Sequence, residues 1–247
     1  METIDLDDST YLFVLTGAGV SAESGVPTFR DSNGLWEQQP VERVASPQGF
    51  IDDPALVWRF YSQRRATAKA VLPNAGHHAL AAIEEKLGDR FLLATQNIDG
   101  LHTRAGSRQV LEIHGSLWKT RCSVCDRAPF DDDAEYTKDT LPGCRVCNER
   151  GAFALLRPHI VWFGENLARA HVETIERFFK RARRHRFVFI AAGTSGVVYP
   201  AAGLVRAARR NGAETWLLNA EPSANAKDFK RVRLGPSTRL LPSLLGV

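Results

Sequence analysis

The chain of 247 residues has no long hydrophobic run, and nowhere does it approach the roughly 18 uninterrupted apolar residues of a membrane-spanning helix. Residues 3–11 are polar and acidic, which differs from the basic and then apolar pattern of a secretory signal. Internal repeats and low-complexity tracts are absent as well. We therefore expect a cytoplasmic protein without a membrane partner, in which thiols stay reduced.

The chain also has little excess charge of either sign. Its 32 basic and 28 acidic residues leave a formal net charge of +4 at pH 7, so we expect no specific nucleic-acid partner. One dense basic cluster spans residues 177–186. We interpret it as the solvated face of a helix that buries Ile175, Phe178 and Phe179, and a contact with nucleic acid or an acidic partner is the less favoured alternative.

Cysteine is scarce, but its four copies are spaced in a regular way. Cys122-x2-Cys125 and Cys144-x2-Cys147 are separated by eighteen residues. Two such thiolate pairs can close a tetrahedral site, which is the geometry of structural Zn²⁺. No cysteine is left over and no coordination position stays open, so we expect the metal to support the fold. Two disulfides, or redox-active pairs, are the less favoured alternatives in a chain without a sign of secretion.

Short apolar runs predict four buried parallel strands, at residues 11–16, 91–95, 186–192 and 215–218. Each run ends in small or polar residues, as expected at the strand ends where ligands of open α/β sheets bind. Helical patterns alternate with these strands, at residues 74–87, 169–185 and 201–211. The order predicts an α/β fold with a doubly wound, Rossmann-like parallel sheet.

Two segments interrupt this alternation. Residues 41–72 have a helical pattern, and residues 119–155 contain the cysteine pairs. We expect them to form a smaller domain, made of a helical insertion and a four-cysteine zinc ribbon. The Rossmann-like domain would then comprise residues 1–40, 73–118 and 156–247, with a cleft between the two domains.

The first predicted strand runs into a glycine-rich loop that extends from Gly17 to Gly25. Glycines let the backbone approach a pyrophosphate, whose charge is favoured by free N–H groups at a helix start. We therefore expect this loop to open a helix and to bind a nucleotide. The signal is weak by itself, because Ala22 stands where the strict pattern has its third glycine and because glycines also make ordinary turns.

Polar side chains crowd the end of the second predicted strand, in Gln96-Asn97-Ile98-Asp99. They could form the floor of a pocket that recognises an amide, or a capped turn with Asn97 or Asp99 as N-cap. His114 follows in Glu112-Ile113-His114-Gly115. A lone histidine is more often packed or on the surface, but a position between this loop and the cysteines favours a chemical role.

Together these motifs resemble the sirtuin family of NAD-dependent protein deacylases, in order from about Tyr11 to the C-terminus. The matching segments are residues 17–30, 95–99, 101–102 and 114–115, the four cysteines, and residues 193–195. The resemblance implies NAD as co-substrate and a structural Zn²⁺. It also implies the reaction: the nicotinamide–ribose bond of NAD breaks while the acyl-lysine oxygen attacks the ribose, and nicotinamide, O-acyl-ADP-ribose and free lysine are released.

The resemblance further implies roles for single residues. Asn97 and Asp99 would hold the nicotinamide carboxamide and its ribose, and Phe29 would shield the reactive ribose face from water. His114 would be the general base for a ribose hydroxyl, a role that suits a side chain whose pKa is near neutral. The other cofactor contacts implied are Gly17, Ala18, Gly19, Ser21, Arg30, Trp36, Gln96, Ile98, Gly193, Thr194, Ser195, Asn219, Ala220, Glu221 and Ser237.

For the protein substrate, residues 161–165 resemble the family's substrate strand. An acyl-lysine peptide would add itself as a β-strand between this segment, with contacts at Val161 and Phe163, and a second loop near Val197. Such main-chain bonding tolerates many flanking sequences. We expect the enzyme to act as a monomer on acylated proteins.

The acyl group itself is predicted from Tyr61 and Arg64, which are three residues apart and so share one helix face. A phenol and a guanidinium in an acyl tunnel would bind a terminal carboxylate, and sirtuins of the desuccinylase and demalonylase subgroup carry Tyr-x-x-Arg at this place. The alternative is a core tyrosine beside an exposed arginine. We expect removal of succinyl and malonyl groups, and of acetyl groups as well.

Two other functions are alternatives to deacylation. A mono-ADP-ribosyltransferase would share NAD binding, and a non-catalytic, NAD-responsive zinc module would bind a partner through the basic cluster at residues 177–186. The presence of Asn97, Asp99 and His114 favours the deacylase.

Overall fold

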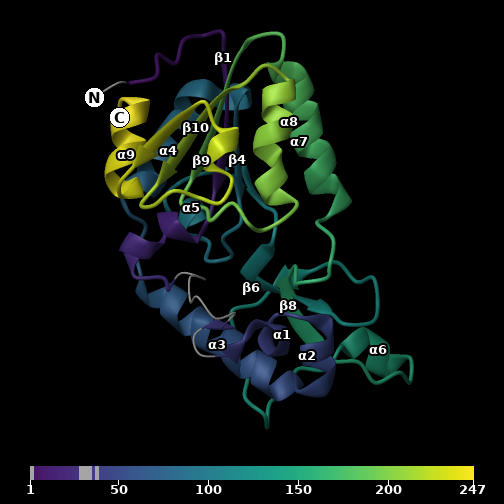
Figure 1. The fold of residues 1–247 in the computed structure, drawn as a ribbon. Helices are drawn as coiled ribbons and strands as arrows, with labels where there is room; N and C mark the ends of the chain where they lie inside the picture. Colours follow the sequence, from purple (N-terminus) through teal and green to yellow (C-terminus); the bar gives the residue numbers. More distant parts are fainter. Residues whose placement is uncertain (1–2, 28–34, 37–38) are drawn as a thin grey trace.

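A computed structural model describes residues 3–27, 35–36 and 39–247, and shows a large α/β part above a smaller part (Figure 1). The large part contains a six-stranded sheet in the order β11-β10-β9-β1-β4-β5, in which every neighbouring pair is parallel. The strands are β1 (Thr10–Thr16), β4 (Phe91–Thr95), β5 (Val110–Glu112), β9 (Arg186–Ala192), β10 (Glu214–Asn219) and β11 (Arg231–Leu234). The predicted doubly wound sheet is therefore confirmed, and β5 and β11 extend it at its two edges.

Helices cover both faces of this sheet (Figure 1). Leu12 and Val14 of β1 pack on one face against α4 (Ala75–Leu87) and α9 (Ser237–Leu245). Phe13 and Leu15 point to the opposite face, where α7 (Arg169–Ala182) and α8 (Leu204–Arg210) lie. Side chains alternate along a strand, so a continuous apolar run such as β1 is stable only when both faces are covered.

The basic cluster at residues 177–186 lies on the outer side of α7 and on the turn after it, and all its basic side chains are exposed. Ile175, Phe178 and Phe179 are buried against the sheet, as predicted. The helix ends at Ala182, three residues before the predicted end.

The smaller part combines helices with a three-stranded antiparallel sheet in the order β7-β6-β8. Trp58, Leu117 and Trp162 share its core with three of the four cysteines. Leu117 and Trp162 lie just outside the predicted insertion at residues 119–155 and still belong to this core. The domain boundaries stay a prediction. The elements of this part are α1 (Val41–Val44), α2 (Pro47–Asp52), α3 (Pro54–Ala70), β6 (Gly115–Cys122), β7 (Phe130–Asp131), α6 (Arg145–Glu149) and β8 (Leu156–Ile160).

Short elements complete the described chain. A two-stranded ladder joins β2 (Leu35–Trp36) to β3 (Gln39–Pro40), and α5 (Leu101–Arg104) follows β4. Single 3₁₀ turns are η1 (Ala18–Val20), η2 (Ala22–Ser24), η3 (Gly88–Arg90), η4 (Ala201–Gly203) and η5 (Ala226–Asp228). Among the described residues, no helix is both long and apolar enough to cross a membrane.

The glycine-rich loop opens helical turns, as expected, but these are short and of the 3₁₀ type. The segment forms the two 3₁₀ turns η1 and η2 and then ends at Gly25, which has a φ of +94°. A left-handed residue terminates a helix, and Pro27 disfavours a helical conformation at the residue before it. The loop therefore offers the N–H groups of two short turns, without the dipole of a full helix.

Candidate active site and metal centre

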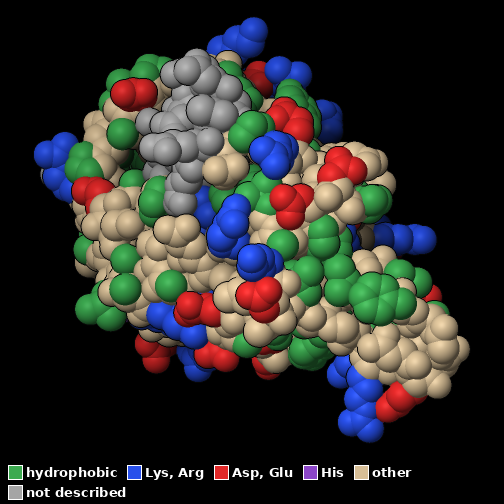
Figure 2. Space-filling view, turned by 90° about the horizontal axis from the view of Figure 1, so that it is seen from below, with side chains coloured by type: hydrophobic (Ala, Val, Ile, Leu, Met, Phe, Trp, Pro, Cys, Tyr) green, Lys and Arg blue, Asp and Glu red, His purple; other side chains and the backbone are tan. Residues whose placement is uncertain are grey.

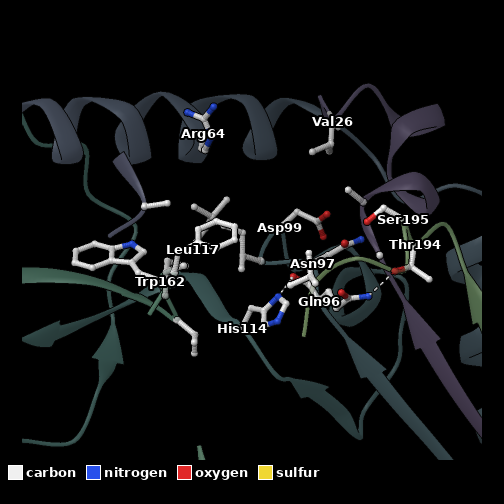
Figure 3. Close-up of a pocket in the computed structure, with 18 of the residues that line it drawn as sticks. Val26, Arg64, Gln96, Asn97, Asp99, His114, Leu117, Trp162, Thr194 and Ser195 are labelled. Carbon is white, nitrogen blue, oxygen red and sulfur yellow. Dashed lines mark hydrogen bonds between the residues drawn. The ribbon is translucent and has the colours of Figure 1, made fainter. Parts of the chain in front are cut away.

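A pocket of about 510 Å³ opens at the carboxyl ends of the sheet strands, between the large and the small part (Figure 3). Strand order reverses between β1 and β9, which is where open α/β sheets form their ligand crevice. The predicted site residues that line it are Gly17, Ala18, Gly19, Tyr61, Arg64, Gln96, Asn97, Ile98, Asp99, His114, Val161, Phe163, Gly193, Thr194 and Ser195.

Two glycine loops meet backbone to backbone at this crevice. The N–H of Gly19 donates to the carbonyl of Gly193 at 2.8 Å. A Cβ atom on Gly19 would lie 2.7 Å from the Gly193 Cα, and Gly193 has a φ of +63°. Both positions therefore require glycine, because any larger residue would separate the loops that follow β1 and β9.

Ser21 connects the two polar residues of the pocket floor. Its hydroxyl donates to Asp99 Oδ2 at 2.7 Å and accepts from the Asn97 amide at 3.1 Å. The second carboxylate oxygen of Asp99 accepts at 2.9 Å from the N–H of Leu101, the first residue of α5. Burial raises the pKa of Asp99 above its ordinary value. Asp99 is therefore a pocket residue, and the alternative of Asn97 or Asp99 as N-cap is wrong, because the N-cap of α5 is Gly100.

His114 lies directly before β6 and faces the same pocket (Figure 3). Its Nδ1 is 3.2 Å from the carbonyl oxygen of Gln96. A carbonyl can only accept, so Nδ1 carries the proton and Nε2 keeps a lone pair. Burial lowers the pKa of His114, which keeps the ring neutral at neutral pH. This tautomer and charge state are those of a general base.

Tyr61 and Arg64 both line the pocket from α3, as their spacing predicts. Tyr61 is fully buried, and its hydroxyl oxygen accepts from Trp162 Nε1 at 3.0 Å. Burial raises the pKa of Tyr61, so the phenol keeps its proton. Arg64 is only 7% exposed, with its guanidinium 3.2 Å from the centre of the Phe60 ring. The alternative of an exposed arginine is therefore wrong.

The segment after β8 does not continue as a strand. β8 ends at Ile160, and the N–H groups of Val161 and Phe163 donate to the carbonyls of His114 and Ala45 at 2.9 Å each. Phe163 is 49% exposed and Val197 is 59% exposed, although both line the pocket. Two exposed apolar side chains thus stand at its edge.

Other predicted residues do not line this pocket or lie outside the described chain. The buried amide of Asn219 donates to the carbonyl of Thr194 at 2.8 Å and so supports the glycine loop from behind. Ser21, Ala220, Glu221 and Ser237 do not line the pocket. Phe29 and Arg30 lie outside the described residues, as does the side chain of Trp36.

Some lining residues were not predicted, among them Leu117, Leu167 and Trp162. Trp162 lies between two residues that were predicted, Val161 and Phe163. Trp162 nevertheless lines the pocket together with both neighbours, because the chain does not continue as a regular strand after Ile160.

The four cysteines form a compact cluster at the far end of β6, whose last residue is Cys122. Their sulfur atoms all lie within 4.8 Å of one another, and the pairs Cys122–Cys147 and Cys125–Cys144 are 3.7 and 3.8 Å apart. A tetrahedron with Zn–S bonds of about 2.3 Å has sulfur atoms about 3.8 Å apart. A disulfide would require about 2.05 Å. The cluster therefore fits Zn²⁺ bound by four thiolates, and the disulfide alternative is excluded.

Replacing Cys144 with alanine should release the zinc and unfold the smaller part, because a structural metal contributes folding free energy. Zinc content by atomic absorption should fall well below one ion per chain, and the thermal unfolding transition should broaden or move down. Ser123→Ala, an exposed change next to Cys122, should keep both properties. Full activity in a zinc-free Cys144→Ala protein would contradict a structural metal.

Comparison with known proteins identifies the family to which this chain is similar. Residues 17–200 match the Sir2 family. An NAD-dependent protein deacylase of Salmonella typhimurium is 45% identical over 98% of this chain and 85% of its own length. The NAD-dependent protein deacylase SIR2rp3 of Trypanosoma brucei brucei is 47% identical over 93% of this chain and 91% of its own length.

Solved structures agree with the sequence relatives. The crystal structure of a Sir2 homologue–NAD complex superposes with a TM-score of 0.84 at 38% identity, over 99% of this chain and 94% of that one. A Sir2 complex with an inhibitor, 2′-O-acetyl-ADP-ribose and deacetylated p53 peptide gives 0.77 at 30% identity, over 96% and 93%. The predicted family, NAD as its co-substrate and the zinc-type cysteine cluster are thereby confirmed: the chain belongs to the Sir2 family.

Proposed function

We propose that this chain is a protein-lysine deacylase that uses NAD to remove succinyl and malonyl groups, and acetyl groups as well, with nicotinamide, O-acyl-ADP-ribose and free lysine as products. One observation carries the proposal. A buried arginine and a buried tyrosine, Arg64 and Tyr61, line the same pocket as Asn97, Asp99 and His114. Acyl recognition and ribose chemistry can therefore occur in one cavity.

The polar end of the pocket suits the co-substrate. NAD supplies an electrophilic ribose carbon and a nicotinamide leaving group. Asn97 and Asp99, which Ser21 holds in place, would orient the nicotinamide. The N–H groups of Gly17, Gly19 and Gly193 already donate to carbonyls, so the glycine loops would serve the phosphates by letting them approach the backbone closely. His114 would take the proton of a ribose hydroxyl on Nε2.

The other end of the pocket suits a negatively charged acyl chain. Arginine carries a permanent charge and can bind a carboxylate through two parallel hydrogen bonds. Tyr61 stays protonated and adds a hydroxyl donor. An acetyl group would fill the same space without using either group.

The peptide itself would lie across the mouth of the pocket. Phe163 and Val197 stand exposed there and would flank the acyl-lysine side chain. Figure 2 shows positive and negative side chains interspersed on the face seen from below. Main-chain bonding of the peptide would make little demand on the charge of its flanking residues.

Peptides that differ only in the acyl group test the proposal. We expect kcat/KM with NAD to be higher for succinyl- and malonyl-lysine than for acetyl-lysine, with O-acyl-ADP-ribose found by mass spectrometry. If the enzyme turns over only the acetyl peptide, the proposed preference for succinyl and malonyl groups is wrong. An ADP-ribosylated protein in place of O-acyl-ADP-ribose would instead indicate a transferase.

A further inference from the structure

Tyr61 accepts a hydrogen bond from Trp162, a residue 101 positions away in the sequence. The indole Nε1–H donates to the phenol oxygen at 3.0 Å, and both side chains are buried. An indole nitrogen can only donate. The phenol therefore cannot donate its own proton to Trp162, and its O–H bond points away from the indole.

Trp162 is itself fixed by a cation and a carboxylate. The guanidinium of Arg157 lies over the indole ring, 3.3 Å from its centre. Glu165 binds Arg157 through both oxygens, at 2.7 and 3.0 Å, and accepts the backbone N–H of Trp162 at 2.8 Å. The backbone and the ring of Trp162 are thus held by one ion pair, most of which is buried.

These contacts do more than pack the core, because they also orient the Tyr61 hydroxyl. A phenol O–H prefers the plane of its ring, which leaves two directions for its proton, and the wrong direction would weaken binding of a carboxylate. A fixed donor to one side of the oxygen disfavours the direction on that side. A cation over the indole face also strengthens the N–H as a donor, because it draws electron density from the ring.

We propose that Trp162, held by the Arg157–Glu165 pair, is a positioning residue for acyl recognition that directs the Tyr61 hydroxyl toward the carboxylate of a dicarboxylic acyl group. The inference rests on the proposed function, since it concerns the same pocket. Trp162 would influence the choice of acyl group through Tyr61, without touching the carboxylate.

The test is a double-mutant cycle with Trp162→Phe and Tyr61→Phe. A neutral hydrogen bond corresponds to about 2- to 12-fold in an equilibrium or rate. We expect Trp162→Phe to lower the ratio of succinyl to acetyl kcat/KM by about 3- to 10-fold. In the Tyr61→Phe background the same substitution should change this ratio by less than about twofold, because no hydroxyl is left to orient.

Trp58→Phe is the matched control. Trp58 is buried in the same core, and its indole N–H donates to the carbonyl of Leu156 at 2.9 Å, away from Tyr61. It should lower the unfolding temperature about as much as Trp162→Phe and leave the acyl ratio unchanged. If Trp162→Phe does not fold, the benzothiophene analogue of tryptophan at position 162 replaces N–H with sulfur at nearly constant shape.

The outcomes separate the two proposals. If the wild-type enzyme does not turn over the succinyl peptide, the proposed function fails. If it does, and Tyr61→Phe lowers that turnover, the inference is overturned when the effects of Trp162→Phe and Tyr61→Phe simply add. It is also overturned when Trp162→Phe slows acetyl and succinyl turnover equally, which is the result that a packing role predicts.

Discussion

Replacing Arg64 with methionine should lower kcat/KM for succinyl-lysine by roughly 30-fold to several thousand-fold, and hardly change it for acetyl-lysine. In the proposed complex the succinyl carboxylate leaves water and pairs with a guanidinium that is only 7% exposed. Removing one partner of a buried charge pair costs about 2–5 kcal/mol, which gives this range of rates. An acetyl group has no charge to leave unpaired. Steady-state kinetics on matched peptides measure both numbers.

The same helix supplies the control. Arg59 is an exposed arginine on α3, so Arg59→Met makes an identical chemical change outside the pocket and should leave both activities intact. Tyr61→Phe should reduce desuccinylation less than Arg64→Met does, because it removes only a hydroxyl. Equal losses with both acyl groups would mean that Arg64 supports the fold of α3 and does not select the acyl chain.

Replacing His114 with tyrosine should lower deacylation of every acyl peptide by about 10²-fold or more, as expected when a general base is lost. The hydrogen bond from Nδ1 to Gln96 leaves Nε2 as the only basic atom of the ring. Zinc content and thermal stability should stay close to those of the wild type, because His114 is no part of the cysteine cluster. The control His78→Tyr makes the same change at an exposed position on α4 and should keep full activity.

The pH profile checks the same assignment. A base must be neutral, and burial lowers the pKa of His114 below the ordinary histidine value of about 6.5. The ring should therefore be mostly neutral already at that pH, and activity should rise to a plateau above it and fall as the pH drops through the lowered pKa. An acidic limb of kcat/KM that persists unchanged in His114→Tyr would assign the titration to another group.

Much of the fold follows from local patterns in the sequence. β1, β4, β9 and β10 are apolar runs long enough to be recognised as strands, and α7 shows its buried stripe directly. β11 was missed because Arg231 and Arg233 alternate with two exposed apolar residues, which gives an edge strand no buried signature. The helix expected from the loop at residues 17–25 is limited to two 3₁₀ turns, because glycine spacing indicates close backbone approach and does not specify how far a helix continues.

The site was less accessible to such patterns. Motifs identify residue types at fixed spacing, and so they indicated His114 and the Tyr61–Arg64 pair. They do not encode contacts between distant segments, such as the hydrogen bond of Trp162 to Tyr61 or the pairing of Arg157 with Glu165. Charge states also needed the structure, since burial sets the pKa directions of Asp99 and His114.

The strand β6 connects the pocket to the cysteine cluster. His114 precedes its first residue, Gly115, and Cys122 is its last residue. Its partner β8 pairs Leu156 with Cys122 at one end and Ile160 with Gly115 at the other. A register shift lies between Gly115 and Thr120, so the eight residues of β6 lie along only five of β8, which span roughly 13 Å. No cysteine lines the pocket, yet β6 connects the cysteine cluster to His114, the residue proposed as general base. A chelator that removes the metal would therefore inhibit without competing with NAD or the peptide, because it would disturb His114 through β6.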